Sequence, residues 1–97
     1  MGLFNMMDSI DTCNRLLKQI EQELRCLISA TQANDITQVT FHTMLLQNLT
    51  TDFVNALDKS SGARLTSYNF CGSRKSGIEI AYYLAEIVSD LRSKLRM

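Results

Sequence analysis

Proline and tryptophan are absent from the sequence, and its 97 residues include only one histidine and four glycines. Proline interrupts a helix because it lacks a backbone donor and clashes with the preceding turn, so its absence is compatible with long helices. No apolar run reaches the about 18 residues that a transmembrane helix needs, since a charged residue interrupts each candidate. The start of the chain lacks the basic segment of a secretory signal. We therefore expect a cytoplasmic protein that makes no membrane contact.

Residues that carry chemistry are also scarce. The three cysteines, Cys13, Cys26 and Cys71, are widely spaced and form no Cys-x-x-Cys pair, which predicts neither a disulfide framework nor a zinc site. The only histidine, His42, has no second histidine with which to share a metal and no evident acid–base partner. The sequence therefore predicts a protein that is not an enzyme and that has no cofactor and no bound metal.

The charges balance overall but are unevenly placed. Ten basic and ten acidic residues give a net charge of zero, which argues against a protein whose main work is to neutralise phosphates. Between residues 34 and 58 the only charged residues are Asp35, Asp52 and Asp58, whereas residues 59–97 are mainly basic. This asymmetry bears on the choice of partner. This balance argues against direct nucleic-acid binding through the basic C-terminal region, which stays an alternative interpretation.

The clearest pattern is an apolar repeat near the start of the chain, with alternating steps of three and four residues. Four unbroken heptads are typical of a helix that packs lengthwise against other helices, as in a coiled coil. We expect an all-α, three-helix chain whose N-terminal helix, at about residues 4–32, assembles into a helical homo-oligomer. The alternative is that the chain's own later helices cover the same face. The predicted oligomerisation residues are Leu3, Met6, Ile10, Cys13, Leu17, Ile20, Leu24 and Leu27.

A second helix follows a break in the apolar repeat. Asp35, with Gln38 three residues later, has the pattern of a helix N-cap and its reciprocal partner. This pattern predicts a helix at about residues 36–58. We expect an irregular connection at about residues 59–75, in which a short extended piece could form.

The last helix begins at a capping box. Ser76 and Glu79 have the spacing of that motif, and the apolar stripe after them predicts a helix at about residues 77–95. We expect all three helices to belong to one domain, residues 1–97.

Four residues around this last helix are the predicted partner contacts. Arg74 and Lys75 precede it in a segment that does not fit the strict phosphate-binding motifs, so we expect them to rim a protein interface. Tyr82 and Tyr83 are adjacent and point about 100° apart on a helix. One can therefore pack inward while the other lies near the surface, where a tyrosine is a good interface anchor.

The helix-forming start from Asp8 to Leu27 and the capped segment from Ser73 to Leu84 resemble in size, layout and texture the compact helical antirepressors of temperate bacteriophages. The resemblance implies a DNA-binding repressor as the partner and removal of that repressor from its operator as the mechanism. It transfers no individual residue, because no family motif accompanies it. Small secretion chaperones share the texture. We therefore expect a protein–protein interaction module that oligomerises and acts in transcription regulation, with a chaperone-like adaptor as the alternative.

Overall fold

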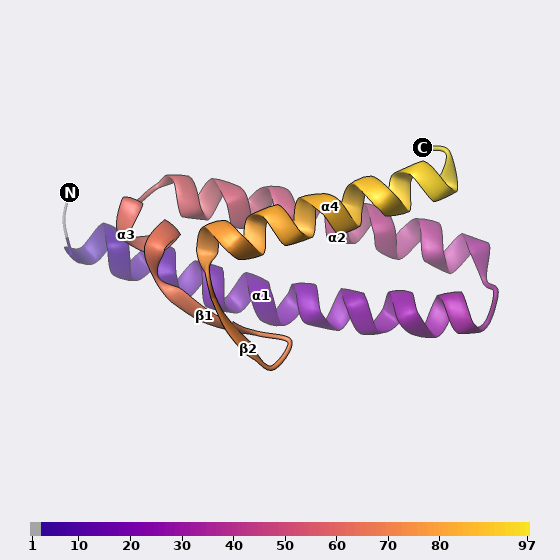
Figure 1. Ribbon diagram of the computed structural model, residues 1–97, viewed down its shortest axis with the longest axis horizontal. Coiled ribbons are helices and arrows are strands. Elements are labelled where there is room, and N and C mark those ends of the chain that lie inside the picture. Colours follow the sequence, from indigo (N-terminus) through magenta and orange to yellow (C-terminus); the bar gives the residue numbers. More distant parts are fainter. Residues whose placement is uncertain (1–2) are drawn as a thin grey trace.

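Three long helices lie side by side along the molecule (Figure 1). The computed structural model describes residues 3–97, with side chains from residue 6 onward. Helices form 80% of the chain, so the predicted all-α class is right apart from a small two-stranded sheet. In chain order the elements are α1 (Leu3–Gln32), α2 (Ile36–Asp58), α3 (Ser61–Leu65), β1 (Ser67–Phe70), β2 (Ser73–Ser76) and α4 (Gly77–Leu95).

Local capping explains where α2 and α4 begin. The Asp35 side chain accepts a hydrogen bond from the Gln38 backbone N–H at 3.1 Å, which satisfies one of the free donors at the start of α2. At the start of α4, Ser76 and Glu79 form a complete capping box, with each side chain bonded to the other residue's backbone N–H. At the start of each helix, at least one free backbone donor therefore finds a side-chain partner within the first turn.

The segment between α2 and α4 contains regular secondary structure, where the sequence predicted an irregular connection over residues 59–75 with a short extended piece. Residues 61–65 form the short helix α3, and β1 and β2 form an antiparallel hairpin in which Phe70 pairs with Ser73. The two residues of its turn, Cys71 and Gly72, have φ angles of 51° and 81°. Positive φ at both positions is the requirement of a type I′ turn, whose twist matches that of the two strands. Cysteine is unusual at the first of these positions, so the sequence carries only a weak turn signal.

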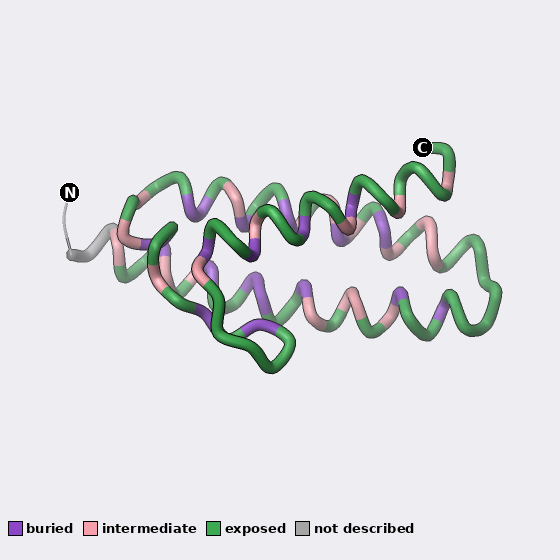
Figure 2. The backbone as a smooth tube through the Cα atoms, viewed as in Figure 1, coloured by how far each residue is buried: buried purple, intermediate pink, exposed green. Residues whose placement is uncertain are grey.

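The core lies where α1, α2, α4 and the hairpin meet (Figure 2). Tyr68 in β1 is buried there, and its hydroxyl donates a hydrogen bond to the Ala63 carbonyl oxygen at 2.9 Å. Burial beside the Cys13 thiol raises the pKa of the Tyr68 phenol. The Tyr68 ring also packs edge-on against Phe53 of α2, with ring centroids 6.3 Å apart, so this aromatic side chain anchors the hairpin in the core. The largest of the fully buried side chains are Tyr68, Phe53, Leu17, Ile20, Leu46, Ile80 and Leu84.

The three long helices do not form three equal interfaces. Among the described residues, the backbones of α1 and α4 each run close to α2, whereas the α1 and α4 backbones rarely come close to each other. Side chains of all three helices still join one core. The hairpin lies across α1 and the first part of α4 (Figure 1). One side of the bundle is therefore open beyond the hairpin. None of the described helices combines the length and apolarity that a membrane span needs.

Candidate protein-binding groove

The residues predicted to drive oligomerisation are mainly core residues of the single chain. Cys13, Leu17 and Ile20 are at most 2% exposed and Leu27 is 5% exposed, whereas Met6, Ile10 and Leu24 are half-buried. The side chain of Leu3 lies outside the described residues. The chain's own later elements thus cover the central part of the heptad face, as in the alternative interpretation of the repeat. Self-association itself stays a prediction, and a surface for it must lie beyond these buried positions.

An apolar surface outside these buried positions lies on the open side of the bundle. A groove of about 440 Å³ runs between the second half of α1 and the second half of α4, with the hairpin turn at one end. Helix periodicity creates its two walls, because α1 and α4 each turn an apolar stripe towards it. The lining residues are Leu24, Leu27, Ile28, Thr31, Gln32, Cys71, Tyr83, Ile87 and Leu91.

The groove is apolar and accessible at the same time. Ile28 is 58% exposed and Tyr83 is 49% exposed, and none of the described lining residues carries a formal charge. Exposed apolar side chains that stand singly are common, but a contiguous group of them in a concave surface marks a site of interaction. Depletion of charge at the centre is also typical of protein–protein interfaces.

Contacts with the hairpin hold one end of the groove in place. The Tyr83 ring packs edge-on against Phe70, with ring centroids 6.1 Å apart. The Cys71 backbone N–H donates a hydrogen bond to Oε2 of Glu21 at 2.8 Å, which fastens the hairpin turn to α1. Desolvation and the nearby Glu21 carboxylate raise the pKa of the Cys71 thiol, while Arg25 opposes them. The shift of this pKa disfavours the thiolate form of Cys71 at this end of the groove.

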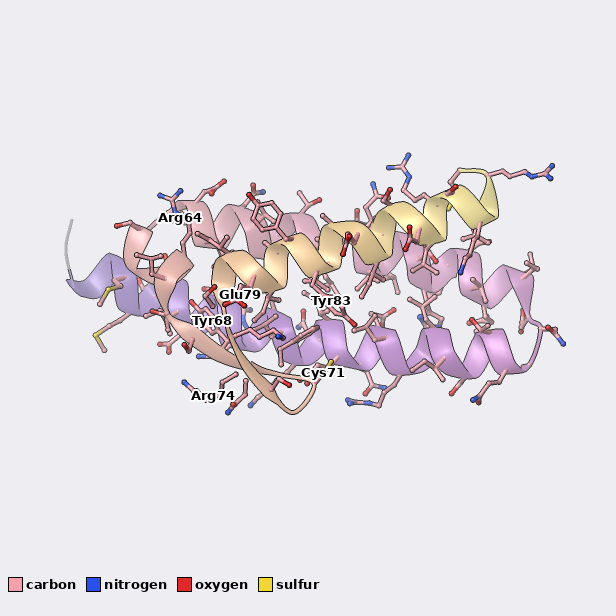
Figure 3. The ribbon with its side chains drawn as sticks, in the orientation of Figure 1. Arg64, Tyr68, Cys71, Arg74, Glu79 and Tyr83 are labelled. Carbon is pink, nitrogen blue, oxygen red and sulfur yellow. The ribbon has the colours of Figure 1, made fainter. Side chains whose placement is uncertain are left out.

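The other predicted partner contacts do not meet in this groove. Tyr82 is 74% exposed and lies on another flank of α4, in a hollow towards α2 and α3. Arg74 in β2 donates hydrogen bonds to Oδ1 of Asn69 and to the Ser67 carbonyl oxygen, at 3.3 and 3.1 Å. These bonds brace the guanidinium along the hairpin. Figure 3 shows Tyr83 towards the middle of the molecule and Arg74 at its edge. Of the four predicted contacts, Tyr83 alone lines the groove; Lys75 is exposed on the hairpin.

A second group of polar residues lies between α1 and α2. Glu23, Cys26 and His42 place a carboxylate oxygen, a thiol sulfur and a ring nitrogen within 4.8 Å of one another. His42 Nδ1 lies 2.7 Å from Oε1 of Glu23, and the two side chains are 17% and 15% exposed. Little in the sequence indicates this group, because His42 comes from a different helix than Glu23 and Cys26. The spacing of Glu23 and Cys26, three residues apart on one helix, was its only local signal.

Comparison of the chain with protein-family models, curated proteins and solved structures finds no match. The groove and the polar group must therefore be interpreted from their own geometry.

Proposed function

We propose that this protein is a helical interaction module, without catalytic activity of its own, that docks apolar helical surface in the groove between α1 and α4. The observation that carries the proposal is the groove itself, an uncharged apolar hollow with Ile28 and Tyr83 exposed in its walls. Helix-in-groove recognition uses apolar side chains at helical spacing on one partner and a hydrophobic groove on the other.

A second copy of the chain is the first proposed occupant. Two copies that face each other through the open side would each cover the other's groove, which is the self-complementary arrangement of a twofold dimer. Such a dimer would also bury apolar surface that a domain of this size leaves exposed. The proposal keeps the predicted self-association but assigns it to the groove, since the central heptad positions are already buried.

The experiment compares two exposed isoleucines. Ile28→Lys places a charge in the groove, near the C-terminal end of α1, where a cation suits the helix dipole. Ile36→Lys makes the same change at a residue that is 67% exposed at the start of α2 and does not line the groove. Light scattering should show a dimer for the wild-type chain and for Ile36→Lys, and a monomer for Ile28→Lys. A dimer that survives Ile28→Lys would contradict the assignment.

A regulatory protein is the second proposed occupant. The resemblance to phage antirepressors implies that this partner is a DNA-binding repressor, which the protein removes from its operator. The test uses a purified repressor–operator complex from the chain's own host. Wild-type protein should release the operator fragment and Ile28→Lys should not. If the wild-type chain dimerises but the repressor keeps its operator fragment, the antirepressor role is refuted. The groove would then remain a self-association surface only.

A further inference from the structure

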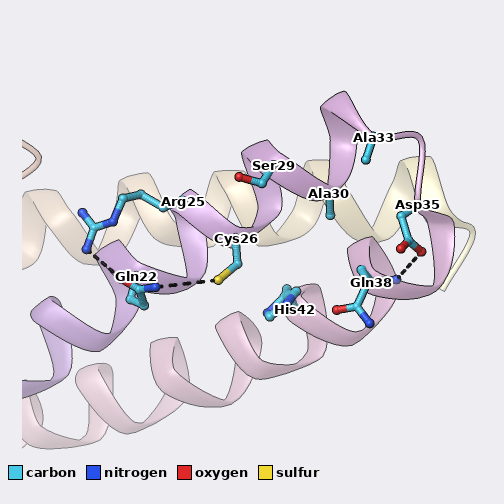
Figure 4. A pocket seen from close by; sticks show the side chains of 9 residues that line it. All are labelled: Gln22, Arg25, Cys26, Ser29, Ala30, Ala33, Asp35, Gln38 and His42. Carbon is cyan, nitrogen blue, oxygen red and sulfur yellow. Dashed lines mark hydrogen bonds between the residues drawn. The ribbon is translucent and has the colours of Figure 1, made fainter.

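Glu23, Cys26 and His42 lie between α1 and α2, outside the groove. Together they have the composition of a metal site. Glu23 and Cys26 lie one helical turn apart on α1, so their side chains lie on the same face of the helix. His42 reaches the same point from α2. The three donor atoms lie within 4.8 Å of one another. Figure 4 shows Cys26 and His42 close together where the two helices meet.

We propose that Glu23, Cys26 and His42 bind a divalent transition metal of the zinc type, which clips α1 to α2. Thiolate sulfur, imidazole nitrogen and carboxylate oxygen are the three kinds of ligand that Zn²⁺ takes from proteins. A soft thiolate together with an imidazole excludes a preference for Mg²⁺ or Ca²⁺, which favour oxygen ligands. This proposal does not rest on the function proposed for the groove.

The three side chains make few hydrogen bonds that a bound metal would have to replace. In a tetrahedral zinc site with bonds of about 2.0–2.3 Å, donor atoms lie roughly 3.3–3.8 Å apart. The 2.7 Å hydrogen bond between Glu23 and His42 would therefore open slightly and the thiol would move in. The only hydrogen bond to Cys26 Sγ among the described residues is a long one, from Nε2 of Gln22 at 3.9 Å. A metal would thus displace one short and one weak hydrogen bond.

A fourth coordination position is open to solvent. Cys26 and His42 both line a surface hollow of about 410 Å³ whose far side carries Asp35 and Gln38 (Figure 4). Water in that hollow can complete a three-ligand site, as in zinc sites that keep an exchangeable position. On binding, the Cys26 thiol loses its proton to solvent, because the thiolate is the ligand form. Metal uptake should therefore release protons and weaken as the pH falls.

The test uses the full chain, freed of metal with a chelator under reducing conditions and titrated with Co²⁺ as a spectroscopic probe. We expect one Co²⁺ per chain, a thiolate-to-cobalt charge-transfer absorption, and displacement of Co²⁺ by Zn²⁺. Cys26→Ser should abolish the charge-transfer absorption. It should also weaken binding at least about tenfold, since loss of an outer-shell partner alone costs about 10–100-fold. Glu23→Gln keeps a similar shape and should weaken binding without removing the absorption.

The matched control is Cys71→Ser, which removes a thiol exposed on the hairpin turn, outside the proposed site. This variant should bind Co²⁺ like the wild type, and far-UV circular dichroism should show the same helix content for every variant. Charge-transfer absorption that survives Cys26→Ser or disappears in Cys71→Ser would overturn the assignment. Binding without that absorption, or one metal for every two chains, would overturn it as well.

Discussion

Gly77, the first residue of α4, offers a sharp test of how tightly α3 and α4 fit together. An added Cβ at this buried glycine would lie 2.6 Å from Leu57 Cδ2, 3.0 Å from the Ala63 carbonyl oxygen and 3.1 Å from the Arg64 carbonyl oxygen. Two of these neighbours are backbone atoms of α3, which cannot move aside alone. The Gly77 backbone N–H also donates to the Thr66 carbonyl oxygen at 3.1 Å, so α4 cannot shift without straining that bond.

We therefore expect Gly77→Ala to destabilise the protein by about 1–3 kcal/mol, the usual cost of overpacking a well-filled site. For a domain of this size the melting temperature should fall by at least about 4 °C. The experiment is thermal unfolding followed by circular dichroism. An unchanged melting temperature would refute the inference that backbone crowding selects glycine here.

Gly62→Ala is the matched control. An added Cβ there would overlap the Met6 thioether, but that side chain is flexible and can rotate away. Alanine also favours the helical conformation over glycine by up to about 1 kcal/mol. Gly62→Ala should therefore be neutral or slightly stabilising. An equal fall in melting temperature for both substitutions would contradict this reasoning. It would show that crowding against backbone atoms costs no more than crowding against a flexible side chain.

Three further outcomes follow from the polar groups. Thr50→Val should raise the free energy of unfolding by about 1 kcal/mol in a denaturant titration, because the buried Thr50 hydroxyl finds no hydrogen-bond partner among the described residues; a loss of stability would contradict this. Glu79→Gln should be less stable than the wild type at neutral pH, since hydrogen bonds from Ser76 lower the pKa of Glu79. That stabilisation is present above the pKa of the unfolded carboxyl and is lost as the pH falls through the lower folded pKa, so acid titration should make the two proteins equal. The Cys71 thiol should react slowly with iodoacetamide at neutral pH, and Glu21→Gln should speed the reaction by removing a charge that raises the pKa of Cys71; mass spectrometry would measure both rates.

The helices could be predicted because their signals are local. Caps such as Ser76 with Glu79 fix the starts, and the apolar period shows which face is buried. That period does not say what covers the face, so it could not distinguish a second copy from the chain's own α2 and hairpin. Leu17, predicted as an oligomer contact, is 2% exposed within one chain. Its replacement by a charge would test folding rather than assembly.

The hairpin and the two candidate sites were harder to predict, the hairpin because of its turn residues and the two sites because of how the helices pack together. A type I′ turn is usually recognised by Asn-Gly or Asp-Gly, and Cys71-Gly72 does not carry that signature. The groove depends on the α4 backbone lying nearer to α2 than to α1, and the polar group depends on which turn of α2 meets Cys26. Each is a matter of register between helices, which side-chain packing decides and single-helix patterns do not contain.

The unequal packing of the three helices has a consequence for how the protein opens. Helix α4 is held mainly by α2 and by the β-hairpin, whereas α1 and α2 hold each other along their lengths. Helix α4 can therefore detach as a unit while α1 and α2 stay folded, because its detachment leaves the contacts between α1 and α2 in place. Amide hydrogens of α4 should therefore exchange with solvent in one cooperative step of lower free energy than those in the middle of α1. Detachment of α4 would also widen the groove that α1 and α4 line, so the groove could then admit a bulkier partner.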